Sequence, residues 1–231
     1  MKTVGIILPM EEEIDALKKY LMINREFYIY ELKFYESIVN NIKCILVQSG
    51  VGKVNAARTT QVLIDNIKVD CIINVGVAGG LSEDLKILDI VIADKLIQHD
   101  FDISVFDHEK GYIPNIGNYI EVDKYLFNIA KSIINENKEI NCLSGTIASG
   151  DIFLTDRSKS QEIKEQFNAI CVEMEAAAIA QVCYLCKVPF LILRSISDIP
   201  NNDNKITYEK FLDKSTAIVA EAIYKILLKL D

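Results

Sequence analysis

The sequence predicts an α/β protein with a twisted, mainly parallel central sheet and helices on both of its faces. Short runs rich in valine and isoleucine alternate with segments of helical periodicity along the whole chain. The runs are apolar throughout, as is typical of strands buried on both faces. No linker rich in proline, glycine or serine, no repeat and no low-complexity block interrupts them. We therefore expect residues 1–231 to form one domain.

The individual elements follow from these patterns in chain order. Apolar runs predict strands at 3–8, 42–48, 69–77, 87–94, 169–174 and 188–197. Apolar residues at helical spacing predict helices at 53–67, 173–187 and 208–230. Residues 27–48 depart from the alternation, because strands follow one another there around Asn40-Asn41. This segment is expected to form an antiparallel excursion within the same sheet.

Composition excludes several classes of function. The chain has 231 residues, half of them hydrophobic, and a net charge of −8. Such a charge, without a lysine-rich run, argues against nucleic acid or an anionic membrane as a partner. The apolar stretch near the N-terminus is too short for a targeting signal, and no segment is long enough to span a bilayer. The six cysteines are scattered, mostly in apolar segments, which is typical of reduced thiols in a cytoplasmic protein.

Polar and glycine-rich segments directly follow the predicted strands. In parallel α/β sheets, ligands bind at the carboxyl ends of the strands, so these segments are where a site is expected. They read PMEEE, SGVGKVNAA, GVAGG, SGDIF, EMEAAA and SISD. SGVGKVNAA and NVGVAGGL match neither a Walker loop nor GxGxxG, and singly each is better explained as a tight turn.

The three adjacent glutamates of PMEEE cannot share one face of a helix, because successive residues are turned by about 100°. If the helix begins near Met10, Glu13 lies on the flank of the inward apolar stripe, whereas Glu11 and Glu12 face outward. All three would also be favourable at the positive end of the helix dipole. Glu13 is therefore the candidate functional carboxylate of the group, with a dipole role as the alternative.

Two further segments carry charge at strand ends. In VEMEA, strand geometry would put Glu173 and Glu175 on one side, where a carboxylate could accept hydrogen bonds from a ribose diol. A charge at a helix N-terminus is the alternative. In RSISD, Arg194 emerges from an apolar strand and needs a partner, which we expect to be a carboxylate at the strand ends. A structural ion pair and an active-site pair explain it equally well, and Asp198 ends the segment.

Cysteine and histidine give weaker signals. The CxxC spacing of Cys183 and Cys186 falls on the apolar stripe of a helix without a nearby histidine, so packing explains it better than metal binding. His99 could act as a base, but a hydrogen-bonding role in a loop explains it better. No metal ion and no cofactor are expected.

Six motifs together resemble the 5′-methylthioadenosine/S-adenosylhomocysteine nucleosidases of the purine nucleoside phosphorylase superfamily. They are, in order, GIILPMEEE, SGVGKVNAA, NVGVAGGL, SGDIF, VEMEAAAIA and RSISD, and they cover nearly the whole chain. The resemblance implies a three-layer α/β sandwich around a mixed sheet. It also implies a cytoplasmic homodimer that takes part in methionine salvage and cleaves the N-glycosidic bond of its nucleoside substrate with water.

The resemblance also implies the site residues. Glu13 would activate the water, Asp198 would bind adenine and help to protonate it at N7, and Arg194 would lie near the water and its base. Residues that would bind the ribose, the adenine and the 5′ substituent are Met10, Val51, Val77, Phe153, Leu154, Glu173, Met174, Glu175 and Tyr208. Phe106 and Pro114 match residues that the dimers contribute to the 5′ pocket of the neighbouring subunit.

The chemistry explains why two carboxyl groups are needed. Adenine leaves poorly as an anion, so an acid must neutralise it while water attacks the ribose from the opposite face. Asp198 must therefore carry a proton when Glu13 is ionised, and their environments should separate their pKa values. Val77 departs from the Ser or Thr that many of these nucleosidases have in this loop, which bears on the choice of substrate.

Three alternatives remain. Nucleosidases that act on 6-amino-6-deoxyfutalosine resemble the sequence too. A phosphorolytic purine nucleoside phosphorylase would need several arginines at a phosphate site, which the glycine-rich loops lack. A protein that only binds nucleosides could share the fold, but would not need Glu13 and Asp198 together.

Overall fold

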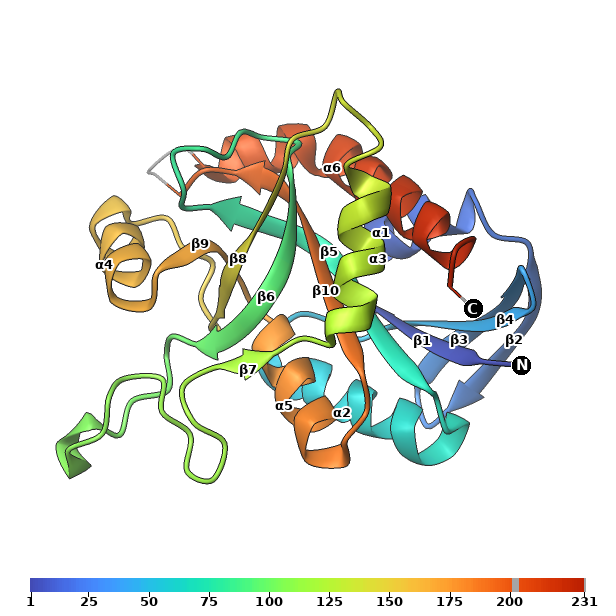
Figure 1. The fold of residues 1–231 in the computed structure, drawn as a ribbon, viewed down its shortest axis with the longest axis horizontal. Helices are drawn as coiled ribbons and strands as arrows, with labels where there is room; N and C mark the ends of the chain where they lie inside the picture. The colour runs from blue at the N-terminus through green and yellow to red at the C-terminus, as the bar shows by residue number, and fades with distance from the viewer. Residues whose placement is uncertain (201–203, 231) are drawn as a thin grey trace.

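A computed structural model of the chain describes residues 1–200 and 204–230, and strands and helices alternate along it (Figure 1). The strands are β1 (Thr3–Leu8), β2 (Ile23–Ile29), β3 (Leu32–Val39), β4 (Ile42–Gln48), β5 (Cys71–Gly80), β6 (Ile90–Gln98), β7 (Ile120–Glu121), β8 (Cys142–Ser149), β9 (Ala169–Glu173) and β10 (Phe190–Asp198). The helices are α1 (Glu11–Lys18), α2 (Lys53–Val62), α3 (Lys124–Ile134), α4 (Arg157–Phe167), α5 (Ala176–Cys186) and α6 (Asn204–Leu227). A π-helical turn (Leu63–Ile67) prolongs α2, and a short 3-10 helix spans Ser104–Phe106.

The strands form one sheet in the order β10-β6-β8-β9-β5-β1-β4-β3-β2, with β7 beside β6. Because β10 also pairs with β5, the strands β5, β10, β6, β8 and β9 close into a ring. Within the ring β6, β8 and β9 run parallel to one another and opposite to β5 and β10. Among the described strands, parallel and antiparallel pairs are equally frequent and the two longest pairings, β10–β5 and β6–β8, are parallel, so the sheet is mixed as expected but less dominated by parallel pairs than predicted.

Helices pack on both faces of the sheet. Alternate residues of β1 show the two sides: Ile6 packs in a cluster with α1, α3 and α6, whereas its neighbour Ile7 packs in a cluster with α2 and α5. The same two groups of helices lie on opposite sides of the strands in Figure 1. Burial on both faces explains why the strands are continuous apolar runs. No helix in residues 1–200 and 204–230 is long and apolar enough to cross a membrane.

The antiparallel excursion forms as predicted. β2, β3 and β4 pair in succession, and Asn40 and Asn41 connect β3 to β4 with φ of 46° and 63°. Positive φ at both central residues is the two-residue turn that fits the twist of a hairpin, and asparagine tolerates it better than most residues.

Three helices differ from the prediction, two in where they begin and one in its geometry. α5 begins at Ala176 rather than at residue 173, because Glu175 has a non-helical backbone with φ of −135°. α6 begins at Asn204 rather than at residue 208. The segment 53–67 is helical throughout but changes from α to π geometry at Leu63. Helices α3 and α4 were not predicted.

The Asn40-Asn41 turn can be tested through stability. Asn41→Val is expected to lower the free energy of unfolding by about 1–2 kcal/mol, the cost of a left-handed backbone in a β-branched residue. Asn41→Gly is the matched control and is expected to be at least as stable as the wild type. Urea unfolding measures the free energy of unfolding of both variants, provided that their m-values equal that of the wild type. A valine variant as stable as the glycine variant would contradict the turn geometry.

Candidate active site

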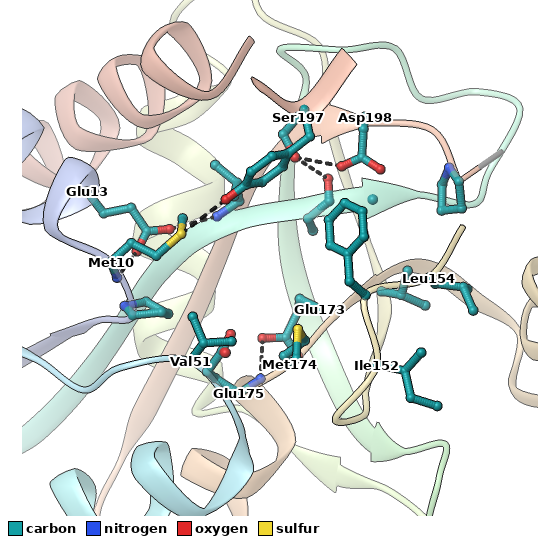
Figure 2. Close-up of a pocket in the computed structure, with 18 residues that line it drawn as sticks. Met10, Glu13, Val51, Ile152, Leu154, Glu173, Met174, Glu175, Ser197 and Asp198 are labelled. Atoms are coloured by element: carbon teal, nitrogen blue, oxygen red, sulfur yellow. Dashed lines mark hydrogen bonds between the residues drawn. The ribbon is translucent and has the colours of Figure 1, made fainter. Parts of the chain in front are cut away.

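A cavity of about 380 Å³ opens where the carboxyl ends of several strands meet (Figure 2). The closed ring brings together loops from strands of both directions. The cavity is lined by Pro9, Met10, Glu13, Val51, Val77, Ala78, Gly79, Ile152, Phe153, Leu154, Val172, Glu173, Met174, Glu175, Ser197, Asp198, Pro200 and Tyr208. The lining has three properties that limit which reactions the cavity could catalyse. Its carboxyl groups are separate from one another, one wall is apolar, and the described lining residues include neither lysine nor arginine.

Glu13 projects into the cavity from the first turn of α1. Its side chain is 1% exposed, whereas Glu11 and Glu12 face solvent. Its Oε2 accepts from the Met10 N–H at 2.9 Å, and its Oε1 accepts from the Val77 N–H at 3.2 Å. Burial raises the pKa of Glu13 to about 8, against the opposing effects of the Met10 N–H and the Arg194 cation. A carboxyl group with this pKa changes its protonation state close to neutral pH.

Arg194 is wholly buried and pairs with Glu173. Its guanidinium donates to Glu173 Oε2 at 2.5 Å, to Asn74 Oδ1 at 2.6 Å and to the Leu193 carbonyl at 2.9 Å. Burial opposes the charged guanidinium, but the neighbouring carboxylates keep its pKa above the usual value. The expectation that Arg194 meets a carboxylate at the strand ends is confirmed.

Glu173 is fully engaged with protein donors. Besides Arg194, its Oε2 accepts from the N–H groups of Glu175 at 3.0 Å and Ala176 at 2.8 Å, and its Oε1 accepts from the Ser149 hydroxyl. The carboxylate therefore lies at the N-terminus of α5, where the helix dipole favours negative charge.

Glu175 points in a different direction from Glu173. β9 ends at Glu173, so the predicted strand spacing does not reach Glu175, and the two carboxylates do not act as a pair on one side. Glu175 Oε1 accepts from the Gly52 N–H at 2.8 Å. Burial, followed by the charge of Glu173, raises the pKa of Glu175 to about 7.

Asp198 lies at the end of β10. Its Oδ1 accepts from the Ser197 hydroxyl at 2.8 Å, and its Oδ2 accepts from the Asn204 amide at 2.7 Å. The same amide donates to the Leu154 carbonyl at 2.9 Å, which ties the loop after β8 to the start of α6. Burial raises the pKa of Asp198 above its usual value despite these donors. The pKa of Asp198 is thus shifted in the direction that makes protonation easier.

The apolar wall comes from both ends of the chain. The Tyr208 hydroxyl donates to Met10 Sδ at 3.1 Å, and the Tyr208 ring meets the Phe153 ring edge-to-face with centroids 5.5 Å apart. Figure 2 shows Val51 above Glu175 and Met174 beside Glu173. These side chains form a surface that suits the flat face of a base or a small thioether.

Most of the residues named from the sequence line this one cavity. Arg194 lies behind it, and Phe106 and Pro114 lie outside it. Phe106 ends the short 3-10 helix on the long connection between β6 and β7, which projects away from the sheet in Figure 1. Phe106 and Pro114 are both exposed, and their contribution to a neighbouring subunit stays a prediction.

Sequence reasoning missed several partners of the carboxyl groups. Asn74, Ser197, Asn204 and the Gly52 N–H each bind a charged group of the site. Ser197 and Asp198 are adjacent, so a hydrogen bond between them could have been anticipated. Asn74 interrupts an otherwise apolar strand, which was a signal for a buried polar partner.

Comparison with known proteins places the chain in a family. The sequence model of the phosphorylase superfamily matches residues 3–230. The 5′-methylthioadenosine/S-adenosylhomocysteine nucleosidase of Staphylococcus carnosus is 40% identical over 228 residues, which cover 98% of this chain and all of that protein. The chain belongs to this nucleosidase family of the phosphorylase superfamily.

Solved structures of such nucleosidases agree in fold. A mutant of the Helicobacter pylori enzyme, crystallised with 5′-methylthioadenosine in its active site, is 35% identical, with a TM-score of 0.96 and full coverage of both chains. A structure described as futalosine hydrolase of H. pylori is also 35% identical, with a TM-score of 0.96 over 99% of this chain and 98% of that one. The nucleoside phosphorylase-like fold of this family member is therefore shown.

The buried state of Glu13 predicts a pH-dependent stability. Its pKa is about 8 in the folded protein against 4.5 for a free glutamate side chain, so the unfolded chain loses the proton first as pH rises. Glu13→Gln is expected to gain stability relative to the wild type, with no gain below about pH 4 and an increase to a few kcal/mol near pH 8. Thermal unfolding from pH 4 to 8.5 measures the difference.

The control for this experiment is Glu12→Gln, which removes a carboxylate from the same helical turn at an exposed position. A stability gain of Glu13→Gln that does not change with pH, or that shrinks as pH rises, would contradict the raised pKa.

Proposed function

We propose that this chain hydrolyses the N-glycosidic bond of 5′-methylthioadenosine and S-adenosylhomocysteine, releasing adenine and the corresponding thioribose. The observation that carries the proposal is the separation of two unlike carboxyl groups across one cavity. Figure 2 shows Glu13 and Asp198 on opposite sides, with Glu175 and Met174 between them along the lower wall. A glycosidic bond lying across this space would have an acid on the base side and a base on the sugar side.

Glu13 is the proposed general base. The Met10 and Val77 N–H groups hold its two oxygens, so the carboxylate has a fixed direction. With a pKa of about 8, Glu13 must give up its proton before it can accept one from water, so the ionised form that acts as base becomes more populated as pH rises toward 8. Val77 supplies this contact through its backbone, which valine does as well as serine or threonine would. Valine in place of serine or threonine at position 77 therefore leaves the backbone contact to Glu13 unchanged.

Asp198 is the proposed acid on the adenine side. Its raised pKa favours a proton, and the Ser197 hydroxyl and the Asn204 amide fix its orientation. Phe153 and Leu154, from the loop after β8, are expected to flank and recognise the base. Glu175 is expected to accept hydrogen bonds from the 2′- and 3′-hydroxyls beside Met174, and Met10, Val51 and Tyr208 to contact the sugar and the 5′ substituent.

Arg194 and Glu173 have a supporting role in this proposal. Arg194 lies behind the cavity, and its charge favours the ionised forms of both Glu13 and Glu175. Glu173 neutralises Arg194 through the buried ion pair, so it acts on the substrate indirectly rather than by binding the ribose.

Hydrolysis is favoured over phosphorolysis by the charges of the site. A phosphate would need cationic donors, and the described lining residues include neither lysine nor arginine. The one arginine behind the wall is already bonded to Glu173 and Asn74. A second candidate, a futalosine-type nucleosidase, is favoured by the H. pylori structure of that description.

We further propose that residues 1–231 form one domain arranged as a three-layer sandwich. We also propose that the protein is a cytoplasmic homodimer. Support comes from the two groups of helices on opposite faces of the sheet. The exposed Phe106 and Pro114, on a connection that projects from the molecule, would complete the 5′ pocket of the second subunit.

The reaction class is tested by measuring adenine release from 5′-methylthioadenosine and S-adenosylhomocysteine, with and without phosphate. Adenine with free methylthioribose, at a rate independent of phosphate, is expected. Release that requires phosphate and yields a sugar phosphate would assign phosphorolysis instead. No release from either nucleoside, with release from 6-amino-6-deoxyfutalosine, would select the second candidate. Binding without any release would indicate a binding protein.

The two carboxyl groups are tested by substitution. Glu13→Gln is expected to lower kcat by at least a thousand-fold while substrate binding, measured by calorimetry, stays within about ten-fold. Asp198→Asn is expected to lower kcat at least a hundred-fold, because adenine then leaves without its proton. Glu12→Gln is the matched control, expected to keep wild-type turnover. Near-normal turnover of Glu13→Gln would rule out the assigned base.

A further inference from the structure

The SGVGKVNAA turn carries the donor to Glu175. Gly52 presents its N–H to Glu175 Oε1 at 2.8 Å. Its backbone has φ of 100°, a conformation that favours glycine, and a Cβ there would lie 3.3 Å from Asp151 Oδ1. Glycine adopts this conformation without strain, so the direction of the Gly52 N–H depends on the contacts that hold the turn.

The next residue, Lys53, is held at both its backbone and its side chain. Its N–H donates to Asp151 Oδ1 at 2.8 Å, and its ammonium donates to Asp100 Oδ1 at 2.5 Å and Gln98 Oε1 at 3.2 Å. These partners come from the loop after β8 and from the end of β6. Through its backbone and its side chain together, Lys53 thus connects the turn after β4 to the ends of β8 and β6.

Asp100 anchors both attachments of Lys53. Its Oδ1 binds the ammonium, and its Oδ2 accepts from the Asp151 N–H at 3.0 Å. Burial alone would raise the pKa of Asp100, but the Lys53 ammonium and the Asp151 N–H hold it below its usual value. The side chains of Lys53 and Asp100 are only 18% and 21% exposed, so this pair is better shielded than an ordinary surface ion pair.

The network also reaches α5, the helix that Glu175 precedes. The Gln98 amide donates to Gln181 Oε1 on α5 at 2.6 Å, so the partner of the Lys53 ammonium is fixed to that helix. On the adenine side, by contrast, the Leu154 carbonyl has its own anchor in Asn204. Loss of the Lys53–Asp100 pair should therefore affect the sugar side of the cavity more than the adenine side.

We propose that Lys53 and Asp100 are positioning residues of the reaction, whose ion pair holds the Gly52 N–H on the Glu175 carboxylate and so aims that carboxylate at the ribose hydroxyls. This inference rests on the proposed function, in which Glu175 binds the 2′- and 3′-hydroxyls. Neither residue lines the cavity. Both act through Glu175, and their effect is specific to substrates that carry the hydroxyls.

The test is the ratio of kcat/KM for 5′-methylthioadenosine to that for its 2′-deoxy counterpart. The wild type is compared with Lys53→Met, Asp100→Asn and the double variant. Lys33→Met is the matched control, since it removes a lysine from an ion pair with Glu26 on the distant β2–β3 hairpin. Partial unfolding lowers both rates alike and leaves the ratio unchanged, so the measurement separates positioning from stability.

Each single variant is expected to lower the ratio at least five-fold, mainly through slower cleavage of the ribonucleoside. The double variant should lower it no further, because the two residues act as one unit, and Lys33→Met should keep the wild-type ratio. Single variants that keep the ratio within two-fold, or a double variant whose loss is the product of the two single losses, would overturn the inference. If the wild type releases no adenine or ignores the 2′-hydroxyl, the proposed function itself fails.

Discussion

The site depends on one buried ion pair, that between Arg194 and Glu173. Arg194 lies on β10, which pairs with β5 and β6, so its guanidinium cannot reach water. The Glu173 carboxylate neutralises this charge and at the same time accepts a hydrogen bond from the first N–H group of α5. Removing one member of such a pair typically costs about 3–5 kcal/mol, because the other is left buried and unpaired. Because the ion pair with Arg194 fixes Glu173, and Glu173 in turn accepts from the Glu175 N–H, the same pair also fixes the backbone that carries Glu175.

The same pair explains the acid–base character of the cavity. A single cation faces three buried carboxyl groups, those of Glu13, Glu173 and Glu175. It cannot stabilise three negative charges in a poorly hydrated space, so the carboxyl groups that lack a direct bond to it keep their protons up to higher pH. Burial is the main cause of the raised pKa values of Glu13 and Glu175; repulsion from a neighbouring carboxylate adds to it, and the Arg194 cation opposes it. Protonation of the two groups is consequently linked, and ligand binding at one affects the other.

Local patterns predicted the parts of the structure that depend on short stretches of chain. The Asn40-Asn41 turn and the buried face that carries Glu13 were readable because residues within one turn determine them. The ring of strands was not, because the direction of β6, β8 and β9 depends on pairing between distant segments. Helix α4 was missed because its sequence is mostly polar and shows no clear apolar stripe. The apolar strand around Asn74 signalled a buried polar partner, but that the partner is Arg194, far along the chain, could be learned only from the tertiary structure.

The contact between Met10 and Tyr208 has a consequence for synthesis of the protein. The first strand emerges early from the ribosome, but the wall of the cavity is incomplete until α6 packs against it. An incomplete chain that lacks α6 also lacks Tyr208, so part of the cavity wall is missing and a ligand has fewer contacts through which to stabilise it. Ligand binding free energy is thus fully available only to the finished chain. In a cell rich in substrate, this contact would favour survival of complete molecules over truncated ones.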